Sequence, residues 1–280
     1  MNRHAYLIMA HNNYTTLQNL IHALDDSRND IYVHIDAKSP AIPVLVSEHS
    51  YLKIIDKRID VQWAHISQVK AEYALLEEAA SRDIYAYYHI ISGTHFPMKS
   101  QNEIHDYYDS LGGRSVVMSL FYTEEDLMHK LGNRHFYLAN AVNGSGIRHH
   151  VNNLLWRLML RLQKESKARK ERLFKGKFSQ WVSLSATDIK TVIEMRVKVL
   201  NKFRYAFCAD EHFIPYIFAQ SGIKPVDNPK LLYMDFPGAS PRNLTVADYD
   251  ALMHSYAIFA RKFSDEDVEI TRLIRNNYSR

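Results

Sequence analysis

The sequence predicts an α/β fold whose central sheet is mostly parallel and is flanked by helices. Residues 5–10 (AYLIMA) and 84–92 (IYAYYHIIS) are apolar runs of the kind that form strands buried on both faces. Residues 31–36 (IYVHID) form a third such run, and segments with apolar residues at helical spacing lie between the three. Repeated strand and helix units favour parallel pairing, because consecutive parallel strands need a crossover connection.

The first hundred residues supply most of these units. After the strand at 5–10, apolar residues recur at helical spacing at Tyr14, Leu17, Leu20, Ile21 and Leu24. Residues 51–56 (YLKIID) form a weaker strand, and Ser67 is expected to cap the helix that follows. The strand at 84–92 ends at a serine and a glycine, before a loop that contains Pro97.

The rest of the chain is first irregular and then helical. Residues from about 110 to 150 are polar and show no clear period. In the last third, three capping boxes precede apolar residues at helical spacing, namely Ser185-x-x-Asp188, Thr245-x-x-Asp248 and Ser264-x-x-Asp267. No linker rich in proline, glycine or serine interrupts the chain, so we predict one domain over residues 1–280.

Composition narrows the class of protein. The 280 residues are 46% hydrophobic and 24% charged, which is ordinary for a globular protein. The apolar runs are too short for a membrane span, and the apolar stretch at the start is too short for a signal peptide. A single cysteine, Cys208, rules out an internal disulfide framework. From these features we expect a cytoplasmic protein. A net charge of +4 gives no reason to expect a nucleic-acid partner.

One basic segment needs separate consideration. Residues 151–177 mix leucines with nine lysines and arginines. A charge run of this kind is most simply a solvated surface helix. The alternative is an amphipathic segment that rests on an anionic membrane face, which would make the protein peripheral to the inner face of the plasma membrane.

Polar side chains follow three of the predicted strands directly, at His11, Asp36 and Ser92. Ligands of open parallel sheets bind at the carboxyl ends of the strands, so these residues are candidates for a binding site. Nucleotide-sugar transferases of the α/β class often end a strand with Asp-x-Asp, which holds a divalent metal; here Lys38 takes the place of the second carboxylate. The pattern fits a lost metal site, a metal-free version of the same chemistry, or a simple strand end.

Residues 209–213 (ADEHF) place two carboxylates and a histidine between apolar stretches. Charged groups on such a border often have shifted pKa values, which is useful for acid and base catalysis. A capped helix with Glu211 in its first turn explains the same pattern, and from spacing alone this is the preferred interpretation. The sequence contains no dinucleotide fingerprint, phosphate loop, HExxH or GxSxG motif.

Seven motifs together resemble one family. They are AYLIMAHNN, IYVHIDAKS, VQWAHISQVKAEYALLEEA, YYHIISGTHFPMKSQNEI, SQWVSLSATDI, CADEHFIPYIF and ARKFSDED. Their order and spacing, over residues 5 to 265, resemble the core-2/I-branching β-1,6-N-acetylglucosaminyltransferases and the related peptide O-xylosyltransferases. The resemblance implies a GT-A-like fold, a UDP-sugar donor, inversion at the anomeric carbon, and no cofactor or metal. It also divides the chain into a nucleotide-binding part (1–110), an irregular basic insertion (111–177) and an acceptor, catalytic and diphosphate-binding part (178–280).

The resemblance assigns the main chemical roles to three residues. Glu211 matches the general base, which takes the proton of the acceptor hydroxyl as that oxygen attacks the sugar. Arg242 and Lys262 match the two cations that stabilise the leaving UDP, in place of a metal. This implication reverses the preference for a plain helix cap at 209–213.

Further positions match the family's substrate pocket. His11, Asp36 and Trp63 match the residues that line the uridine site, with His34-Ile35-Asp36 as the strand-end motif. Contacts to the donor and acceptor sugars are implied for Ser92, Gly93, Thr94, His95, Gln180, Trp181 and Asp210. His95 stands where many relatives have aspartate, and each of these residues also has a purely structural explanation, such as core packing for Trp63 and Trp181.

The predicted function is therefore an inverting, metal-independent transfer of a sugar, with GlcNAc favoured, from a UDP-sugar to a hydroxyl of a glycan acceptor. The absence of paired cysteines and of an anchor resembles a bacterial, cytosolic member, which would act on a glycan or lipid-linked oligosaccharide in surface polysaccharide or lipopolysaccharide synthesis. Two alternatives stay open. In the first, the same reaction uses UDP-xylose, UDP-galactose or UDP-glucose as the donor. In the second, the protein is a catalytically silent carbohydrate- or nucleotide-binding protein.

Overall fold

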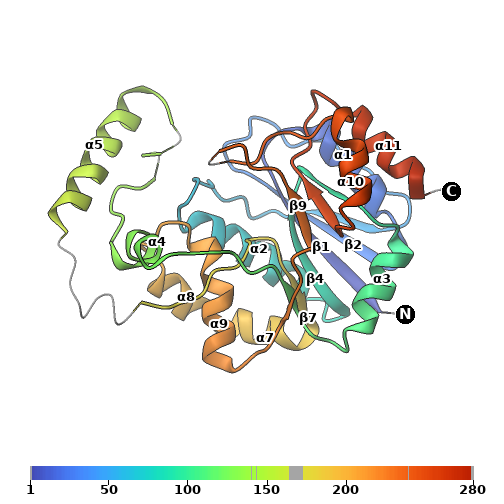
Figure 1. Ribbon diagram of the computed structural model, residues 1–280, viewed down its shortest axis with the longest axis horizontal. Helices are drawn as coiled ribbons and strands as arrows, with labels where there is room; N and C mark the ends of the chain where they lie inside the picture. The colour runs from blue at the N-terminus through green and yellow to red at the C-terminus, as the bar shows by residue number, and fades with distance from the viewer. Residues whose placement is uncertain (1, 140, 143, 164–172, 239, 279–280) are drawn as a thin grey trace.

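The structure is a computed structural model that describes residues 2–139, 141–142, 144–163, 173–238 and 240–278. Its centre is a seven-stranded sheet with the order β3-β2-β1-β4-β7-β6-β8 (Figure 1). The strands are β1 (Arg3–Ala10), β2 (Asn29–Ile35), β3 (Tyr51–Ile54), β4 (Tyr85–Ser92), β6 (Val116–Val117), β7 (Ser183–Ser185) and β8 (Val226–Asp227). A smaller sheet has the order β5-β10-β9, from β5 (His95–Pro97), β9 (Leu232–Met234) and β10 (Phe259–Arg261).

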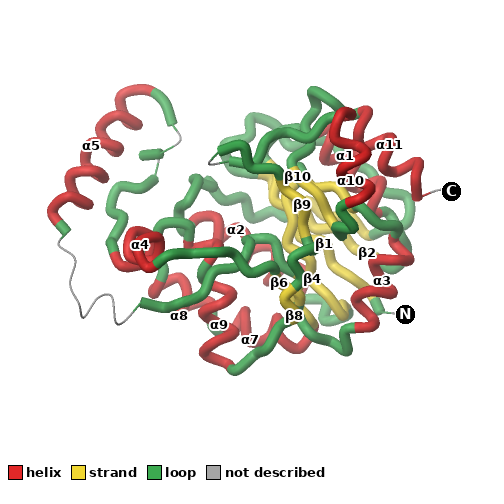
Figure 2. The backbone as a smooth tube through the Cα atoms, in the orientation of Figure 1, coloured by secondary structure: helices red, strands yellow, loops and turns green. Residues whose placement is uncertain are grey.

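Helices flank the central sheet (Figure 2). The α-helices are α1 (Tyr14–Leu24), α2 (Ser67–Ala80), α3 (Gln101–Ser110), α4 (Glu124–Leu127), α5 (Gly146–Leu162), α7 (Ala186–Glu194), α8 (Arg196–Lys202), α9 (Phe213–Ser221), α10 (Tyr249–His254) and α11 (Glu269–Tyr278). A π-helix spans Met128–Gly132, and 3-10 turns span Ala209–Glu211 and Val246–Asp248. The predicted α/β, GT-A-like class is confirmed.

The register of the sheet brings the ends of three strands together. Strands β3, β2, β1 and β4 are parallel neighbours, and β7 pairs antiparallel with β4. Ala10 pairs with Ile35, and Met9 pairs with Ser92, so β1, β2 and β4 end at the same edge. The strands are buried along almost their whole length, as their continuous apolar runs predict.

The predicted helix starts had mixed outcomes. Ser185 caps α7 by accepting the Asp188 N–H, and Thr245 with Asp248 forms a complete capping box. The prediction for Ser67 is wrong: α2 begins at this residue, and its hydroxyl accepts the N–H of Gln62 instead. The prediction for Ser264 is also wrong.

Residues 264–267 form a turn before α11, which begins only at Glu269. The Asp267 carboxylate accepts the N–H of Val246, from a loop distant in the sequence, at 2.9 Å. A long-range hydrogen bond thus replaces the local box that the sequence suggested.

The small sheet joins the C-terminal part of the chain to the edge of the large one. Strand β10 is antiparallel to β5 and parallel to β9, and Phe96, Phe263, Ile270 and Ile274 pack beside it in a second apolar core. The Phe263 N–H donates to the Thr94 carbonyl at 2.9 Å. At the other side, Asp265 accepts the Thr16 N–H at 2.7 Å, near the start of α1. These contacts bring residues 261 and 262 to the ends of β1 and β4.

Three buried histidines from β1, β4 and α3 form a cluster in the interior. His4 Nδ1 lies 3.0 Å from His89 Nε2, and the rings of His4 and His105 stack with centroids 4.0 Å apart. Ser183 Oγ lies 2.8 Å from His89 Nδ1, and Asn29 Oδ1 lies 2.9 Å from His105 Nε2. Burial lowers the pKa of all three rings, that of His89 to about 3, so the cluster is neutral at pH 7.

The basic segment predicted over 151–177 has two parts. Its first part belongs to α5, which lies at one end of the long axis of the molecule (Figure 1). Residues 164–172, which carry much of the predicted charge, lie outside the described residues. Among the helices that the structure describes, none has both the length and the hydropathy to cross a membrane.

Candidate active site

The three strand ends form the floor of the candidate site. The Asp36 N–H donates to the Ala10 carbonyl and the Gly93 N–H donates to the Met9 carbonyl, each at 2.9 Å. A side chain at position 93 would place its Cβ 3.0 Å from the Ala10 Cβ. Glycine at this position therefore lets the loop after β4 approach β1 closely.

Asp36 forms an ion pair with Lys38, the residue that takes the place of the second carboxylate of an Asp-x-Asp motif. Lys38 Nζ lies 3.0 Å from both carboxylate oxygens of Asp36 and 2.8 Å from Asp60 Oδ1. Arg58 donates hydrogen bonds to the carbonyls of Asp36 and Ser39, which stabilises the loop after β2. No three His, Cys, Asp or Glu side chains gather in a metal-binding geometry within the described part of the chain.

His11 directly follows β1, and Trp63 lies two residues after Val61, whose carbonyl accepts a hydrogen bond from Lys38. Partial desolvation lowers the pKa of His11, and the charges of Lys38 and Lys262 lower it further while Asp36 opposes them. Trp63 is 46% exposed and contacts Phe207 edge to face, with ring centroids 5.6 Å apart. Nearly half of the Trp63 surface is therefore available for contact with a ligand.

The turn after β4 is stabilised by hydrogen bonds among its own residues. Ser92 approaches His95 Nδ1 with its backbone N–H at 3.0 Å and its hydroxyl at 2.7 Å, and the same hydroxyl lies 2.9 Å from Thr94 Oγ1. His95 is completely buried, and burial followed by the charge of Arg261 lowers its pKa well below the usual range. His95 therefore supports the turn as a neutral ring, and its contact with a sugar stays a prediction.

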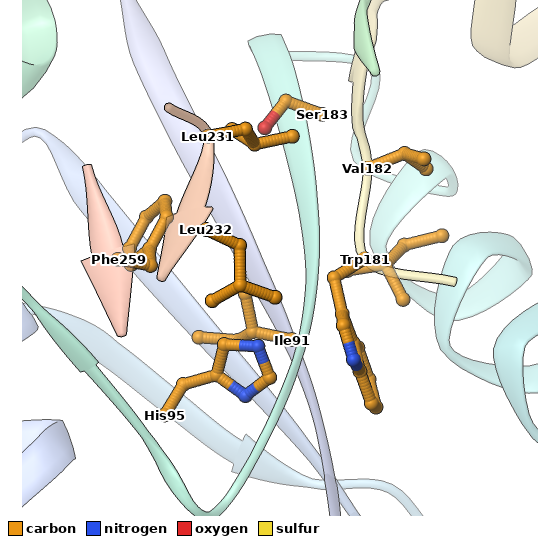
Figure 3. Close-up of a pocket in the computed structure, with 9 residues that line it drawn as sticks. Ile91, His95, Trp181, Val182, Ser183, Leu231, Leu232 and Phe259 are labelled. Carbon is orange, nitrogen blue, oxygen red and sulfur yellow. The ribbon is translucent and has the colours of Figure 1, made fainter. Parts of the chain in front are cut away.

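Trp181 packs against His95 at a small, mostly apolar pocket. Figure 3 shows the rings of His95 and Trp181 side by side among the residues that line this pocket. The ring centroids are 4.8 Å apart at an interplanar angle of 70°. With a cavity volume of about 10 Å³, the pocket is far smaller than ordinary ligand sites. Trp181 is mostly buried, as the core-packing alternative predicted, so its stacking on a sugar stays a prediction.

Arg261 is a site residue that sequence reasoning missed. Its guanidinium carbon lies 4.8 Å from the centre of the Trp181 ring, and its Nε is buried without a hydrogen-bond partner. Burial lowers the pKa of Arg261 to about 10, and burial together with Arg261 lowers the pKa of Lys262. In the described ranges, neither cation is paired with a carboxylate. Two adjacent, partly desolvated cations without counterions form a favourable site for an anion.

Arg242 has a different environment. Its guanidinium forms ion pairs with Asp235 and Asp248, each at 2.5 Å. The hydrogen bonds to Asp248 and then to Asp235 raise the pKa of Arg242. Its charge is already compensated, so the structure does not group it with Arg261 and Lys262. Its predicted contact with UDP is not tested by this geometry.

Glu211 combines a restrained carboxylate with a free oxygen. Lys130 Nζ lies 2.7 Å and Lys177 Nζ 3.6 Å from Glu211 Oε2. Burial alone would lower the pKa of Lys130, but the charge and hydrogen bond of Glu211 outweigh this effect and raise it. Oε1 forms no hydrogen bond or ion pair with any described residue, and the side chain is 24% exposed. The carboxylate can therefore accept a proton from a ligand while two lysines fix its orientation.

Two more carboxylates lie behind Glu211. Burial and then the charge of Glu211 raise the pKa of Asp210 to about 7. Burial and then Asp210 raise the pKa of Glu72 well above its usual range, although Gln180 donates to Glu72 Oε1 at 2.8 Å. Gln180 thus contacts the interior of the site through Glu72, a residue absent from the sequence predictions. Its signal was a charge on the otherwise apolar face of α2.

Comparison with known proteins identifies the class and then the family. The parallel strands and the floor at their carboxyl ends, with Arg261 and Lys262 beside it, define an α/β domain with a candidate ligand site at the strand ends. Residues 4–268 match the family described as Branch: Core-2/I-Branching enzyme, and the chain belongs to that family.

Two curated relatives match part of the chain. The mouse protein "Beta-1,3-galactosyl-O-glycosyl-glycoprotein beta-1,6-N-acetylglucosaminyltransferase 4" is 29% identical over 119 residues, which is 40% of this chain and 26% of the relative. The human protein with the same description and the number 3 is 28% identical over 121 residues, which is 41% of this chain and 28% of the relative. The matched segments therefore span little more than a quarter of either relative.

Proposed function

We propose that the protein transfers a sugar from a UDP-sugar to a hydroxyl of a glycan acceptor, with inversion and without a divalent metal. GlcNAc is the favoured sugar, because both curated relatives carry N-acetylglucosaminyltransferase in their names. The observation that carries the proposal is the arrangement at Glu211, where one oxygen is bound by lysines and the other is free for a substrate.

Glu211 is proposed to act as the general base. The acceptor hydroxyl gives its proton to Oε1 while its oxygen forms the new bond to the anomeric carbon. The bond from that carbon to the UDP oxygen breaks on the opposite face, so the configuration inverts. Proton transfer to a positioned carboxylate typically contributes about 10²- to 10⁴-fold in rate.

Arg261 and Lys262 are proposed to bind the diphosphate. Negative charge grows on UDP as the glycosidic bond breaks, and fixed cations in a partly desolvated site stabilise that charge. Both residues lack a carboxylate partner among the described residues, and both lie beside the ends of β1 and β4. Arg242 stays a candidate from the family resemblance alone.

The uridine is proposed to lie over the ends of β1 and β2. Asp36 and His11 present hydrogen-bonding groups there, and Trp63 offers the exposed part of its ring for stacking. Because Lys38 holds both Asp36 oxygens, the carboxylate is oriented before the donor binds. We further propose a bacterial setting, with a growing surface glycan or lipid-linked oligosaccharide as acceptor.

A donor screen tests this function directly. Thermal shifts are measured with UDP and with its GlcNAc, galactose, glucose and xylose derivatives, in the presence of EDTA. UDP release with each donor is then measured with and without candidate glycan acceptors. We expect stabilisation by UDP and release of UDP from at least one donor. No stabilisation by any of these nucleotides would contradict the proposal, and binding without release would favour a silent binding protein.

A further inference from the structure

Helix α5 exposes a continuous apolar stripe. Ile147, Val151, Leu154, Leu158 and Leu162 recur every three or four residues, and their side chains are between 45 and 83% exposed. Residues at this spacing lie on one face of a helix. No residue of α5 is fully buried, so the stripe is not part of the core. Five adjacent exposed aliphatic side chains on one face are unusual for a surface that meets only water.

The opposite face of α5 is attached to the protein, which fixes the stripe outward. The amide groups of Asn152 and Asn153 donate to the carbonyls of Ala139 and Ala141, at 2.8 and 2.6 Å. Trp156 Nε1 donates to His135 at 3.0 Å. These three residues lie on the helix face away from the stripe. The helix is therefore oriented by polar contacts and not by burial of its apolar side.

Charge indicates what covers the stripe. The sequence of α5, GIRHHVNNLLWRLMLRL, contains three arginines and no acidic residue. Arg148, Arg157 and Arg161 are all exposed, and none of them forms an ion pair with a carboxylate in the described part of the chain. By helical spacing, Arg157 and Arg161 border one side of the stripe and Arg148 the other. An apolar stripe with arginines on both sides, on a helix without acidic residues, is complementary to a bilayer whose surface is negative.

We propose that α5 binds an anionic lipid surface, with the stripe inserted among the acyl chains and the arginines at the phosphate groups. The inference stands on α5 alone and goes beyond the proposed catalytic function. It also has a geometric consequence for the site. Trp156 on the attached face stacks on Phe207, with centroids 6.1 Å apart and an angle of 12°. Phe207 in turn contacts Trp63, so a bilayer at α5 lies close to the candidate site.

Vesicle binding by the full chain tests the proposal. Vesicles of phosphatidylcholine alone are compared with vesicles that also contain phosphatidylglycerol, by co-sedimentation at low and high salt. We expect binding to the anionic vesicles only, and a steep decrease with salt. The double substitution Arg157→Gln and Arg161→Gln should lower the partition coefficient about 25-fold, because each cation near an anionic surface contributes about fivefold.

The apolar stripe is tested separately. Leu154→Ser with Leu158→Ser should lower binding at least about tenfold, since inserted methylene groups are lost. Arg114→Gln and Val44→Ser are matched controls, because both residues are exposed and lie outside α5. Circular dichroism and melting temperatures verify that each variant is folded, and the wild-type comparison of the two vesicle types needs no variant.

Three outcomes would overturn the proposal. The first is no binding of the wild type to anionic vesicles at low salt. A second is unchanged vesicle binding by the serine variants. In that case α5 would bind polyanions in general, and binding to heparin would show this. In the third, ultracentrifugation finds a dimer that the serine variants dissociate, without vesicle binding, and the stripe is then an interface between two copies. Each result is independent of transferase activity.

Discussion

Lys38 Nζ lies at equal distance, 3.0 Å, from the two carboxylate oxygens of Asp36. The residue that takes the place of the second carboxylate of an Asp-x-Asp motif thus forms an ion pair with the first. The same ammonium contacts Asp60, so it is held from two sides. The replacement of the second carboxylate by lysine therefore changes the chemistry of the strand end and does not merely remove a ligand.

The first prediction concerns metal ions. Because Lys38 neutralises Asp36, and Arg261 with Lys262 can neutralise the diphosphate, sugar transfer should continue at its full rate in EDTA. The measurement is initial rate of transfer with EDTA, and again after manganese or magnesium is added in excess. A rate that collapses in EDTA and returns with manganese would contradict the metal-free mechanism.

The second prediction concerns Glu211. Glu211→Gln keeps the shape of the side chain but cannot take the proton, so turnover should fall about 10²-fold or more while UDP affinity stays near the wild-type value. Asp210→Asn is the matched control, because this buried neighbour lies behind the proposed base. Near-normal turnover of Glu211→Gln at saturating donor would remove Glu211 as the base and make Asp210 the next candidate.

The third prediction separates the candidate diphosphate cations. Lys262→Gln and Arg261→Gln should each weaken UDP binding by about 10- to 100-fold, since charge-assisted hydrogen bonds are commonly worth about 1.5–3 kcal/mol. Arg242→Gln should have a smaller effect, because Asp235 and Asp248 already compensate its charge. Lys224→Ala, at an exposed position, is the control. Calorimetry with UDP gives the affinities, and equal losses for Arg242 and Lys262 would restore Arg242 to the site.

The fourth prediction concerns acid stability. His4, His89 and His105 are neutral in the fold because burial lowers their pKa values, whereas in the unfolded chain they bind protons near pH 6.5. Below pH 6.5 the unfolded state binds more protons at these three rings, so their contribution to the free energy of unfolding should decrease as pH falls from 6.5 towards 3. The slope contributed by each histidine approaches about 1.4 kcal/mol per pH unit. Urea unfolding between pH 7 and 5 checks this slope. His89→Gln should reduce it, and an exposed control, His49→Gln, should not.

The fifth prediction has the opposite sign. Glu72 and Asp210 have raised pKa values in the fold, so the folded state keeps protons that the unfolded chain releases near pH 4. Their contribution to stability is complete below pH 4 and decreases as pH rises towards 7. Glu72→Gln removes one such group and keeps an amide near Gln180. Its melting temperature relative to the wild type should therefore increase between pH 5 and 8, and a constant difference would show that Glu72 is ionised in the fold.

Local patterns predicted the parts of the molecule that depend on local physics. The buried strands and the strand-end position of Asp36 follow from apolar runs and from the parallel topology that such runs favour. The caps at Ser185 and Thr245 were found because a cap needs only four consecutive residues. The box at Ser264 failed because Val246, distant in the sequence, takes the carboxylate of Asp267.

The residues that were missed owe their roles to tertiary contacts. Lys130 lies in a π-helix within a segment of no clear period, and only the fold brings its ammonium to Glu211. Arg261 lies in a strand of three residues, and nothing in ARKF shows that its guanidinium stacks on Trp181. Glu72 could have been found, because a carboxylate on the apolar face of a helix needs a partner or a raised pKa.

The pairing of β10 with β5 also determines when, during synthesis of the chain, the proposed nucleotide site can form. A ribosome delivers the chain from its amino end, so β1, β2 and β4 can associate while Arg261 and Lys262 have not yet been made. Such a nascent chain would hold Asp36 and Glu211 but no paired cations for a diphosphate. Affinity for the nucleotide should thus arise late, and a product of early termination before β10 should be unable to sequester UDP-sugar from the intact enzyme.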